Sequence, residues 1–352
     1  MCEKVLNLYC EKEGFGNRYR EEKLLQLNRL IELERKKADT ARKGYFKPDF
    51  SSVPNYVNSI VHYREEFLSM LGWPLCPKPV EAMQMDVVEE FVAEDDLGCI
   101  YRMNIPAISC MTTYGLLFLP KKEGPHPLII AQHGGAGTPE VCAGFFGSGN
   151  YNNMVRRVLK RGFAVFVPQL LLWDAERFGP VYDRKHMDNQ LKQLGGSITA
   201  LEVCQIRTSL DFLLSREDIC SDKVGMIGLS YGGFYTLFTA AAEPRIKASL
   251  VSCFFNNRFI YDWSDWIWFN AGNTFLDAEV CGLVCPRPLY IEAGIKDDLF
   301  DVKYAREEYM KVKEIYEKVG VGKKLKFKEF RGGHELNVED EGIEFICSAL
   351  EV

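Results

Sequence analysis

Short apolar runs separated by helical patterns constrain the fold of this chain more than any other feature of its sequence. Strands that are apolar on both faces and alternate with helices are typical of a parallel sheet covered by helices on both sides. The sequence therefore predicts an α/β architecture. Five such runs and a final strand-like run lie at residues 128–131, 164–167, 224–229, 248–251, 289–292 and 325–330.

The segments just before these runs have a different pattern. Residues 83–87 alternate apolar and polar side chains, as a strand with one wet face does. Residues 99–105 and 113–119 also have the composition of strands. We expect these first two or three strands to form an antiparallel lead-in to a mostly parallel sheet, within a main domain over residues 81–352.

Residues 1–80 are predicted to form a helical extension. Residues 19–43 are highly charged with apolar residues at near-helical spacing, and a second helix is expected over residues 55–71. The interpretation that we favour is an extension packed on the main domain, and the alternative is a dimerisation arm that makes a homo-oligomer. The apolar side of the first helix consists of Leu24, Leu27, Leu30, Ile31 and Leu33.

Composition and charge exclude several classes of protein. The net charge of −6 argues against nucleic-acid binding, which needs clustered lysine and arginine. The longest apolar runs are far too short to span a bilayer, and residues 1–4 begin no apolar signal segment. None of the twelve cysteines forms a CxxC pair, which favours free thiols, a cytoplasmic location and no metal site.

The sharpest motif is Gly-Leu-Ser-Tyr-Gly-Gly at residues 228–233. An apolar run precedes it and a helix-like segment follows, so the G-x-S-x-G pattern sits in the strand–turn–helix context that its chemistry needs. Gly228 and Gly232 have no side chains, which lets strand and helix approach closely. The turn is expected to expose the hydroxyl of Ser230 as a nucleophile.

A serine nucleophile needs a base, because its hydroxyl is a poor nucleophile until a neighbour takes its proton. His334 is the best placed of the five histidines, directly after the last strand-like run. The acid that orients it is expected after residues 289–293. Asp297 and Asp298 both qualify; we favour Asp297, and we expect the other to cap the following helix.

Gln-His-Gly-Gly-Ala-Gly at residues 132–137 is the candidate oxyanion loop. Acyl transfer places negative charge on a carbonyl oxygen, which preorganised backbone N–H groups can stabilise. One donor is expected from Tyr231, just after the nucleophile, and the other from Gly134 or Gly135. A phosphate-binding loop is the competing interpretation, but the spacing of the glycines does not match one.

Two insertions are expected to cover the site, near residues 168–197 and 253–286. Loops at the carboxyl ends of parallel strands are where such sheets bind ligands. Trp173, Trp263 and Trp266 are the candidate substrate-pocket residues, with a buried aromatic patch as an equal alternative. Three arginines are also candidates for binding a substrate carboxylate, with surface or structural ion pairs favoured for each: Arg177, Arg258 and Arg287.

On these motifs the chain resembles the α/β hydrolases, closest to the dienelactone hydrolase, acetyl xylan esterase and prolyl oligopeptidase-like branches. The resemblance covers roughly residues 110–352 and implies catalytic roles for Ser230, Asp297 and His334, with Tyr231 as an oxyanion donor. Two departures tilt the comparison toward an esterase. Dienelactone hydrolases use cysteine where Ser230 stands, and an 80-residue helical segment cannot form the propeller of an oligopeptidase.

The function that we expect is hydrolysis of a small-molecule carboxylic ester through an acyl-enzyme, without cofactor or metal. Acetylated carbohydrate is one candidate substrate. An exopeptidase of the oligopeptidase type and a catalytically inactive hydrolase-fold binding protein remain the alternatives. Preference for aminoacyl anilides over acetate esters would indicate the first, and failure of Ser230 to react with a fluorophosphonate would indicate the second.

Overall fold

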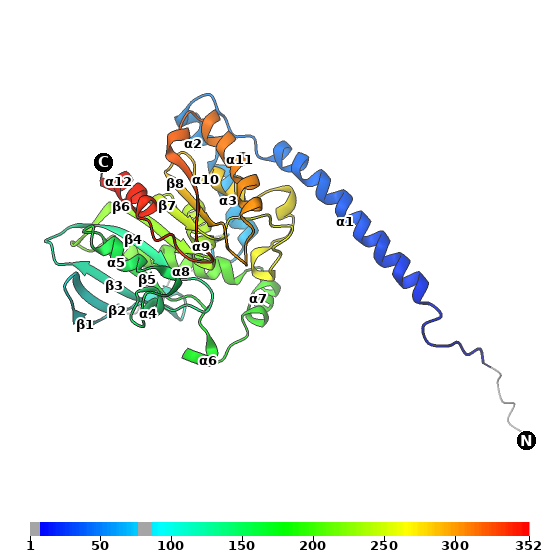
Figure 1. Ribbon diagram of the computed structural model, residues 1–352, viewed down its shortest axis with the longest axis horizontal. Helices are drawn as coiled ribbons and strands as arrows, with labels where there is room; N and C mark the ends of the chain where they lie inside the picture. Colours follow the sequence, from blue (N-terminus) through cyan, green and yellow to red (C-terminus); the bar gives the residue numbers. More distant parts are fainter. Residues whose placement is uncertain (1–7, 77–85, 352) are drawn as a thin grey trace, which may run out of the picture.

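The computed structural model describes residues 8–76 and 86–351. Within these ranges the chain forms a nine-stranded sheet between layers of helices (Figure 1). The strand order is β1-β2-β3-β5-β4-β6-β7-β8-β9. The strands are β1 (Val88–Glu94), β2 (Gly98–Ile108), β3 (Met111–Pro120), β4 (His126–Gln132), β5 (Ala164–Pro168), β6 (Ile219–Leu229), β7 (Ile246–Ser252), β8 (Leu289–Gly294) and β9 (Leu325–Phe330).

The direction of the strands divides the sheet in two. Strands β5, β4, β6, β7, β8 and β9 pair in parallel, whereas β1, β2 and β3 pair antiparallel with one another and β3 pairs antiparallel with β5. This confirms the predicted mostly parallel sheet with antiparallel lead-in strands. The strand predicted at residues 83–87 lies largely outside the described residues.

Alternate side chains of the central strands enter two separate apolar cores. Leu128 and Ile130 of β4 belong to the core covered by α2, α3, α8, α9, α10 and α11, and Ile129 and Ala131 belong to the core covered by α4, α5 and α12. This explains why the run is apolar on both faces. The helices are α1 (Asn17–Tyr45), α2 (Val53–Ser59), α3 (Val61–Leu71), α4 (Pro139–Cys142), α5 (Met154–Leu159), α6 (Ala175–Phe178), α7 (Arg184–Gln193), α8 (Ile198–Leu213), α9 (Tyr231–Ala242), α10 (Asp277–Val284), α11 (Val302–Lys318) and α12 (Glu341–Glu351).

Two segments with short helices of their own interrupt the parallel part of the sheet, and their role as insertions that cover the site stays a prediction. Helices α6 and α7 lie between β5 and α8, and two short 3₁₀ turns with α10 lie between β7 and β8. The N-terminal segment also contacts this region, because the Ser197 hydroxyl donates to the carbonyl of Leu71. In the described part of the chain, no helix combines the length and the apolarity that crossing a bilayer requires.

The N-terminal helices differ in how they meet the body of the molecule. The helix predicted over residues 55–71 is divided at Ile60 into α2 and α3, and Phe67 of α3 is fully buried between Phe238 and Phe275. Helix α1 is buried against the body only near its C-terminal end, at Ala38 and Arg42, and the rest of the helix projects outward (Figure 1). All five residues of its predicted apolar side are exposed, and a homo-oligomer through these helices stays a prediction: Leu24, Leu27, Leu30, Ile31 and Leu33.

We expect Phe67→Ala to lower the free energy of unfolding by about 3–5 kcal/mol, because it opens a cavity in a well-packed core. Val57→Ala in α2 is the matched control, since Val57 is partly exposed, and its cost is expected to stay within about 1 kcal/mol. Denaturant unfolding measures both. Equal effects of the two substitutions would show that α3 is not part of the main core.

Candidate active site

Ser230 lies in the tight turn between β6 and α9, with φ of 60° and ψ of −123°. This left-handed conformation is unfavourable for a residue with a side chain. The turn is held by the Ser230 N–H, which donates to the carbonyl of Ser252 at 2.9 Å. The flanking glycines are required by packing: a Cβ on Gly228 would overlap the carbonyl of Gly232, and one on Gly232 would overlap that of Gln132.

His334 and Asp297 meet at the ends of β9 and β8. His334 Nδ1 lies 2.9 Å from Asp297 Oδ2, while the other carboxylate oxygen accepts the backbone N–H groups of Leu299 and Phe300. Burial acts to raise the pKa of Asp297, but the hydrogen bonds and the charge of His334 outweigh it and hold the pKa below its ordinary value. The geometry therefore brings Asp297, rather than Asp298, to His334.

Ser252 and Cys253 connect the serine turn to the histidine region. Ser252 accepts the Ser230 N–H, and the next residue places its thiol within 4.8 Å of the ligand atoms of Asp297 and His334. The Ser230 hydroxyl makes no hydrogen bond to His334 within the described ranges. Catalytic hydrogen bonds are often long in unliganded enzymes and tighten when substrate binds.

Among the described residues, one cluster of three side chains could hold a metal ion. It consists of Cys253, Asp297 and His334. A metal would need the cysteine as a thiolate. Burial raises the pKa of the Cys253 thiol well above its ordinary value. The Cys253 side chain is therefore a neutral thiol beside the His334–Asp297 pair, and we assign no metal to this group.

The predicted oxyanion loop runs beside the nucleophile, because a Cβ on Gly134 would lie 3.1 Å from that of Ser230. The structure corrects one of its two candidate donors. The N–H of Gly134 donates to the Tyr151 hydroxyl at 2.8 Å, so it is already used. Gly135, which faces the Tyr231 ring, and the N–H of Tyr231 at the start of α9 remain as candidates.

The three predicted pocket tryptophans have different surroundings. Trp263 is 39% exposed and stacks on Tyr231, with ring centroids 5.6 Å apart. Trp173 pairs with Ala136 of the oxyanion loop through a backbone bridge. Trp266 is buried at 1% exposure with its ring centroid 4.8 Å from that of Tyr231, so it packs within an aromatic patch, and its place in the substrate pocket stays a prediction.

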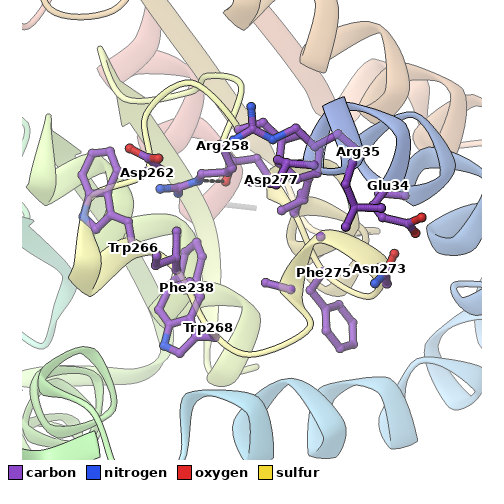
Figure 2. A pocket seen from close by; sticks show the side chains of 18 residues that line it. Glu34, Arg35, Phe238, Arg258, Asp262, Trp266, Trp268, Asn273, Phe275 and Asp277 are labelled. Carbon is purple, nitrogen blue, oxygen red and sulfur yellow. Dashed lines mark hydrogen bonds and ion pairs between the residues drawn. The ribbon is translucent and has the colours of Figure 1, made fainter. Parts of the chain in front are cut away.

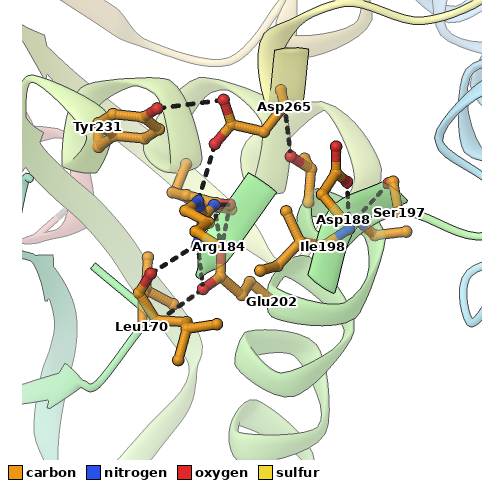
Figure 3. A network of polar contacts seen from close by, with 12 residues as sticks. Leu170, Arg184, Asp188, Ser197, Ile198, Glu202, Tyr231 and Asp265 are labelled. Atoms are coloured by element: carbon orange, nitrogen blue, oxygen red, sulfur yellow. Dashed lines mark hydrogen bonds and ion pairs between the residues drawn. The ribbon is translucent and has the colours of Figure 1, made fainter. Parts of the chain in front are cut away.

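A polar network that the sequence did not reveal connects both insertions to Tyr231 (Figure 3). Arg184 of α7 makes a two-pronged contact with Glu202 of α8, at 3.0 and 2.9 Å, and its Nε donates to Asp265 at 2.8 Å. The other oxygen of Asp265 accepts the Tyr231 hydroxyl at 3.1 Å. The residue beside the nucleophile is therefore fixed by contacts from both insertions, which are far apart along the chain.

Glu292, within β8, is a second buried group that the sequence did not reveal. Its Oε1 accepts the Ser252 hydroxyl at 2.8 Å and the N–H of Asn337, in the loop after His334, at 2.9 Å. Burial raises the pKa of Glu292 to about 7. The side chain thus connects the serine-supporting strand to the histidine loop, and a charged residue in a strand gives no sequence signal for such a role.

Residues 115–259 match the model of the dienelactone hydrolase family. The Bacillus subtilis protein YtaP, described as a hydrolase, is 25% identical over 198 residues, covering 51% of this chain and 64% of that protein. The 2,6-dihydropseudooxynicotine hydrolase of Paenarthrobacter nicotinovorans is 27% identical over 132 residues, covering 38% and 29%. The matches span less than two thirds of either relative.

Solved structures share the fold at low sequence identity. A Bacteroides fragilis protein described as an acetyl xylan esterase aligns with a TM-score of 0.64 at 15% identity, covering 84% of this chain and 81% of that one. The glucuronoyl esterase from Solibacter usitatus aligns with a TM-score of 0.60 at 14% identity, covering 87% and 98%. At these identities the likeness establishes the fold.

The sheet topology, the strained serine turn and these matches together define the class of protein. The chain has the α/β-hydrolase fold, and its residues 115–259 are similar to the dienelactone hydrolase family. The predicted fold class and the predicted resemblance are confirmed.

Glu292 gives a pH-dependent prediction. Its pKa is raised from 4.5 to about 7 in the folded state, so the folded protein binds the proton more tightly than the unfolded chain. Its contribution to stability is therefore present below pH 4.5 and is lost as pH rises toward 7. Glutamine does not titrate, so Glu292→Gln does not lose this contribution. As pH rises from 4.5 to 7, the unfolding free energy of Glu292→Gln should therefore rise by on the order of 2–3 kcal/mol relative to that of wild type.

Denaturant unfolding of both proteins across this pH range measures the difference. Glu329→Gln is the control, because Arg306 holds the pKa of Glu329 below its ordinary value of 4.5, so the contribution of Glu329 is lost only below this pH range and changes little within it. If the difference in unfolding free energy between wild type and Glu292→Gln did not change with pH, the raised pKa of Glu292 would be contradicted.

Proposed function

We propose that this protein is a serine carboxylic-ester hydrolase that works through an acyl-enzyme. Ser230 attacks the ester carbonyl while His334 takes its proton, and the N–H groups of Tyr231 and Gly135 receive the developing oxyanion. His334 then gives the proton to the departing alcohol. Water, activated by the same histidine, attacks the acyl group and releases the carboxylic acid together with free Ser230. Asp297 holds the histidine tautomer and stabilises the imidazolium.

The observation that carries this proposal is the meeting of three chain segments at one edge of the sheet. A serine in a strained turn, with its N–H on Ser252, lies across one corner from a histidine whose Nδ1 is 2.9 Å from a carboxylate. Structural stability alone does not favour such a turn, which costs on the order of 1–3 kcal/mol. Strain of this kind concentrates at functional sites.

We further propose that the ester is carried by a carbohydrate, with an acetylated sugar as the leading candidate. Two features support this substrate class. Trp263 presents a partly exposed indole beside Tyr231, and a flat aromatic face suits a sugar ring. Structural neighbours described as an acetyl xylan esterase and a glucuronoyl esterase use the same fold.

The roles of the two adjacent aspartates are separable by substitution. Asp297→Asn is expected to lower kcat for p-nitrophenyl acetate by about 10³–10⁴-fold, because the histidine loses its orienting carboxylate. Asp298→Asn is the matched control and is expected to leave kcat within about twofold, since within the described chain His334 pairs with Asp297. Steady-state kinetics of both variants, with Ser230→Ala as the reference for lost acylation, check the assignment. Activity that survives Ser230→Ala would refute the proposed reaction.

The proposed sugar-binding role of Trp263 is tested with paired substrates. Trp263→Ala should raise KM for an acetylated xylo-oligosaccharide about tenfold, through loss of ring stacking, and should leave p-nitrophenyl acetate hydrolysis nearly unchanged. Phe269→Ala, at a side chain that is 97% exposed, is the control and should affect neither substrate. Equal loss on both substrates would contradict a carbohydrate-specific role and leave the ester chemistry intact.

A further inference from the structure

A second cavity lies outside the candidate active site, between α1 and the insertion that follows β7 (Figure 2). Its volume is about 540 Å³, within the range of small-molecule sites. Ser230, Asp297 and His334 are not among its lining residues. Its walls are mostly apolar and include Ile31, Ala38, Phe238, Trp266, Trp268 and Phe275.

Arg258 is the unusual residue in the wall of this cavity. It is 5% exposed, and its Nε donates to Asp277 Oδ1 at 2.8 Å. Its two terminal nitrogens, Nη1 and Nη2, are buried and have no hydrogen-bond partner among the described residues. A buried donor without a partner costs about 1–3 kcal/mol, and more when the group is charged. The guanidinium lies over the rings of Phe234, Phe238, Phe254 and Trp266, at 4.7 to 5.6 Å from their centroids.

The same fold shows how a purely structural buried arginine is satisfied. Arg287 donates from Nε to the carbonyl of Val284. Its Nη1 and Nη2 reach four further backbone carbonyls at 2.6 to 3.2 Å. Arg184 likewise donates from all three of its nitrogens. Arg258 differs from both because aromatic rings, which accept no conventional hydrogen bond, surround its free end.

We propose that this cavity binds a small carboxylate with an apolar body, and that Arg258 recognises the carboxylate through Nη1 and Nη2. A guanidinium fork matches the two oxygens of a carboxylate and forms a pair of charge-assisted hydrogen bonds. The apolar body of the ligand fills the space between Ala38 of α1 and Trp268. Because the terminal nitrogens are shielded, the ligand reaches them after a lining ring turns aside.

Trp266 separates this second site from the candidate active site. One of its neighbours is Arg258, at 4.7 Å from the ring centroid, and another is Tyr231, whose ring centroid is 4.8 Å away. The inference does not depend on the proposed esterase reaction, since no triad residue takes part in it. Binding and catalysis can therefore be tested apart.

Fluorine NMR with 4-fluorobenzoate tests the proposal on the full chain. Ser230 is first blocked with a fluorophosphonate, or replaced by alanine, so that the active site does not contribute. We expect saturable binding of 4-fluorobenzoate and at least tenfold weaker binding of the neutral 4-fluorobenzamide. Arg258→Gln should weaken binding of the carboxylate at least tenfold, while Arg306→Gln, at an exposed arginine away from the cavity, should not.

Arg258→Lys keeps the charge and serves as a second variant should the glutamine variant fail to fold. It is expected to retain weak carboxylate binding, because an ammonium cannot form the two-pronged contact. Equal binding of benzoate and benzamide, or unchanged binding in a folded Arg258 variant, would overturn the proposal. So would a complete absence of binding to the wild-type chain.

Discussion

The hydrogen bond from the Ser230 N–H to the carbonyl of Ser252 is the contact on which the candidate site depends. Ser230 adopts a left-handed conformation that its side chain disfavours, and this bond ties the turn to the neighbouring strand β7. The turn also requires Gly228 and Gly232, where any Cβ would overlap a backbone carbonyl. The nucleophile is thus held by backbone contacts, and its hydroxyl is left free for chemistry.

The rest of the site is built outward from this turn by groups that touch two elements at once. Glu292 joins Ser252 to Asn337, and so joins the serine strand to the histidine loop. Asp265 joins the Tyr231 hydroxyl to Arg184, and so joins the candidate oxyanion donor to both insertions. Each bridging side chain is buried, where hydrogen bonds are less weakened by water. These bridges fix the base of the site, and Trp263 above it is partly exposed.

Buried arginines show two uses of the same side chain within one fold. Arg287 places all its donors on backbone carbonyls and stabilises the junction of α9, α10 and β7. Arg258 has one carboxylate partner and an aromatic enclosure. A cation over aromatic rings gains about 0.5–2 kcal/mol per favourable contact, which offsets part of its desolvation but supplies no hydrogen-bond acceptor. That difference is the basis for proposing Arg258, and not Arg287, as a ligand-binding arginine.

The periodicity of the sequence determined the parallel sheet and its antiparallel lead-in, because burial on both faces of a strand leaves a continuous apolar run. The G-x-S-x-G turn was equally readable, since its glycines are a local requirement. Only the tertiary structure showed that Asp297, rather than Asp298, lies within hydrogen-bond distance of His334, because the two adjacent residues have the same chemistry and differ only in where their side chains point. It also showed that the Gly134 N–H is used by Tyr151 and that Trp266 lies beneath Tyr231. Contacts such as those of Arg184 and Glu292 join residues distant along the chain, so no local pattern records them.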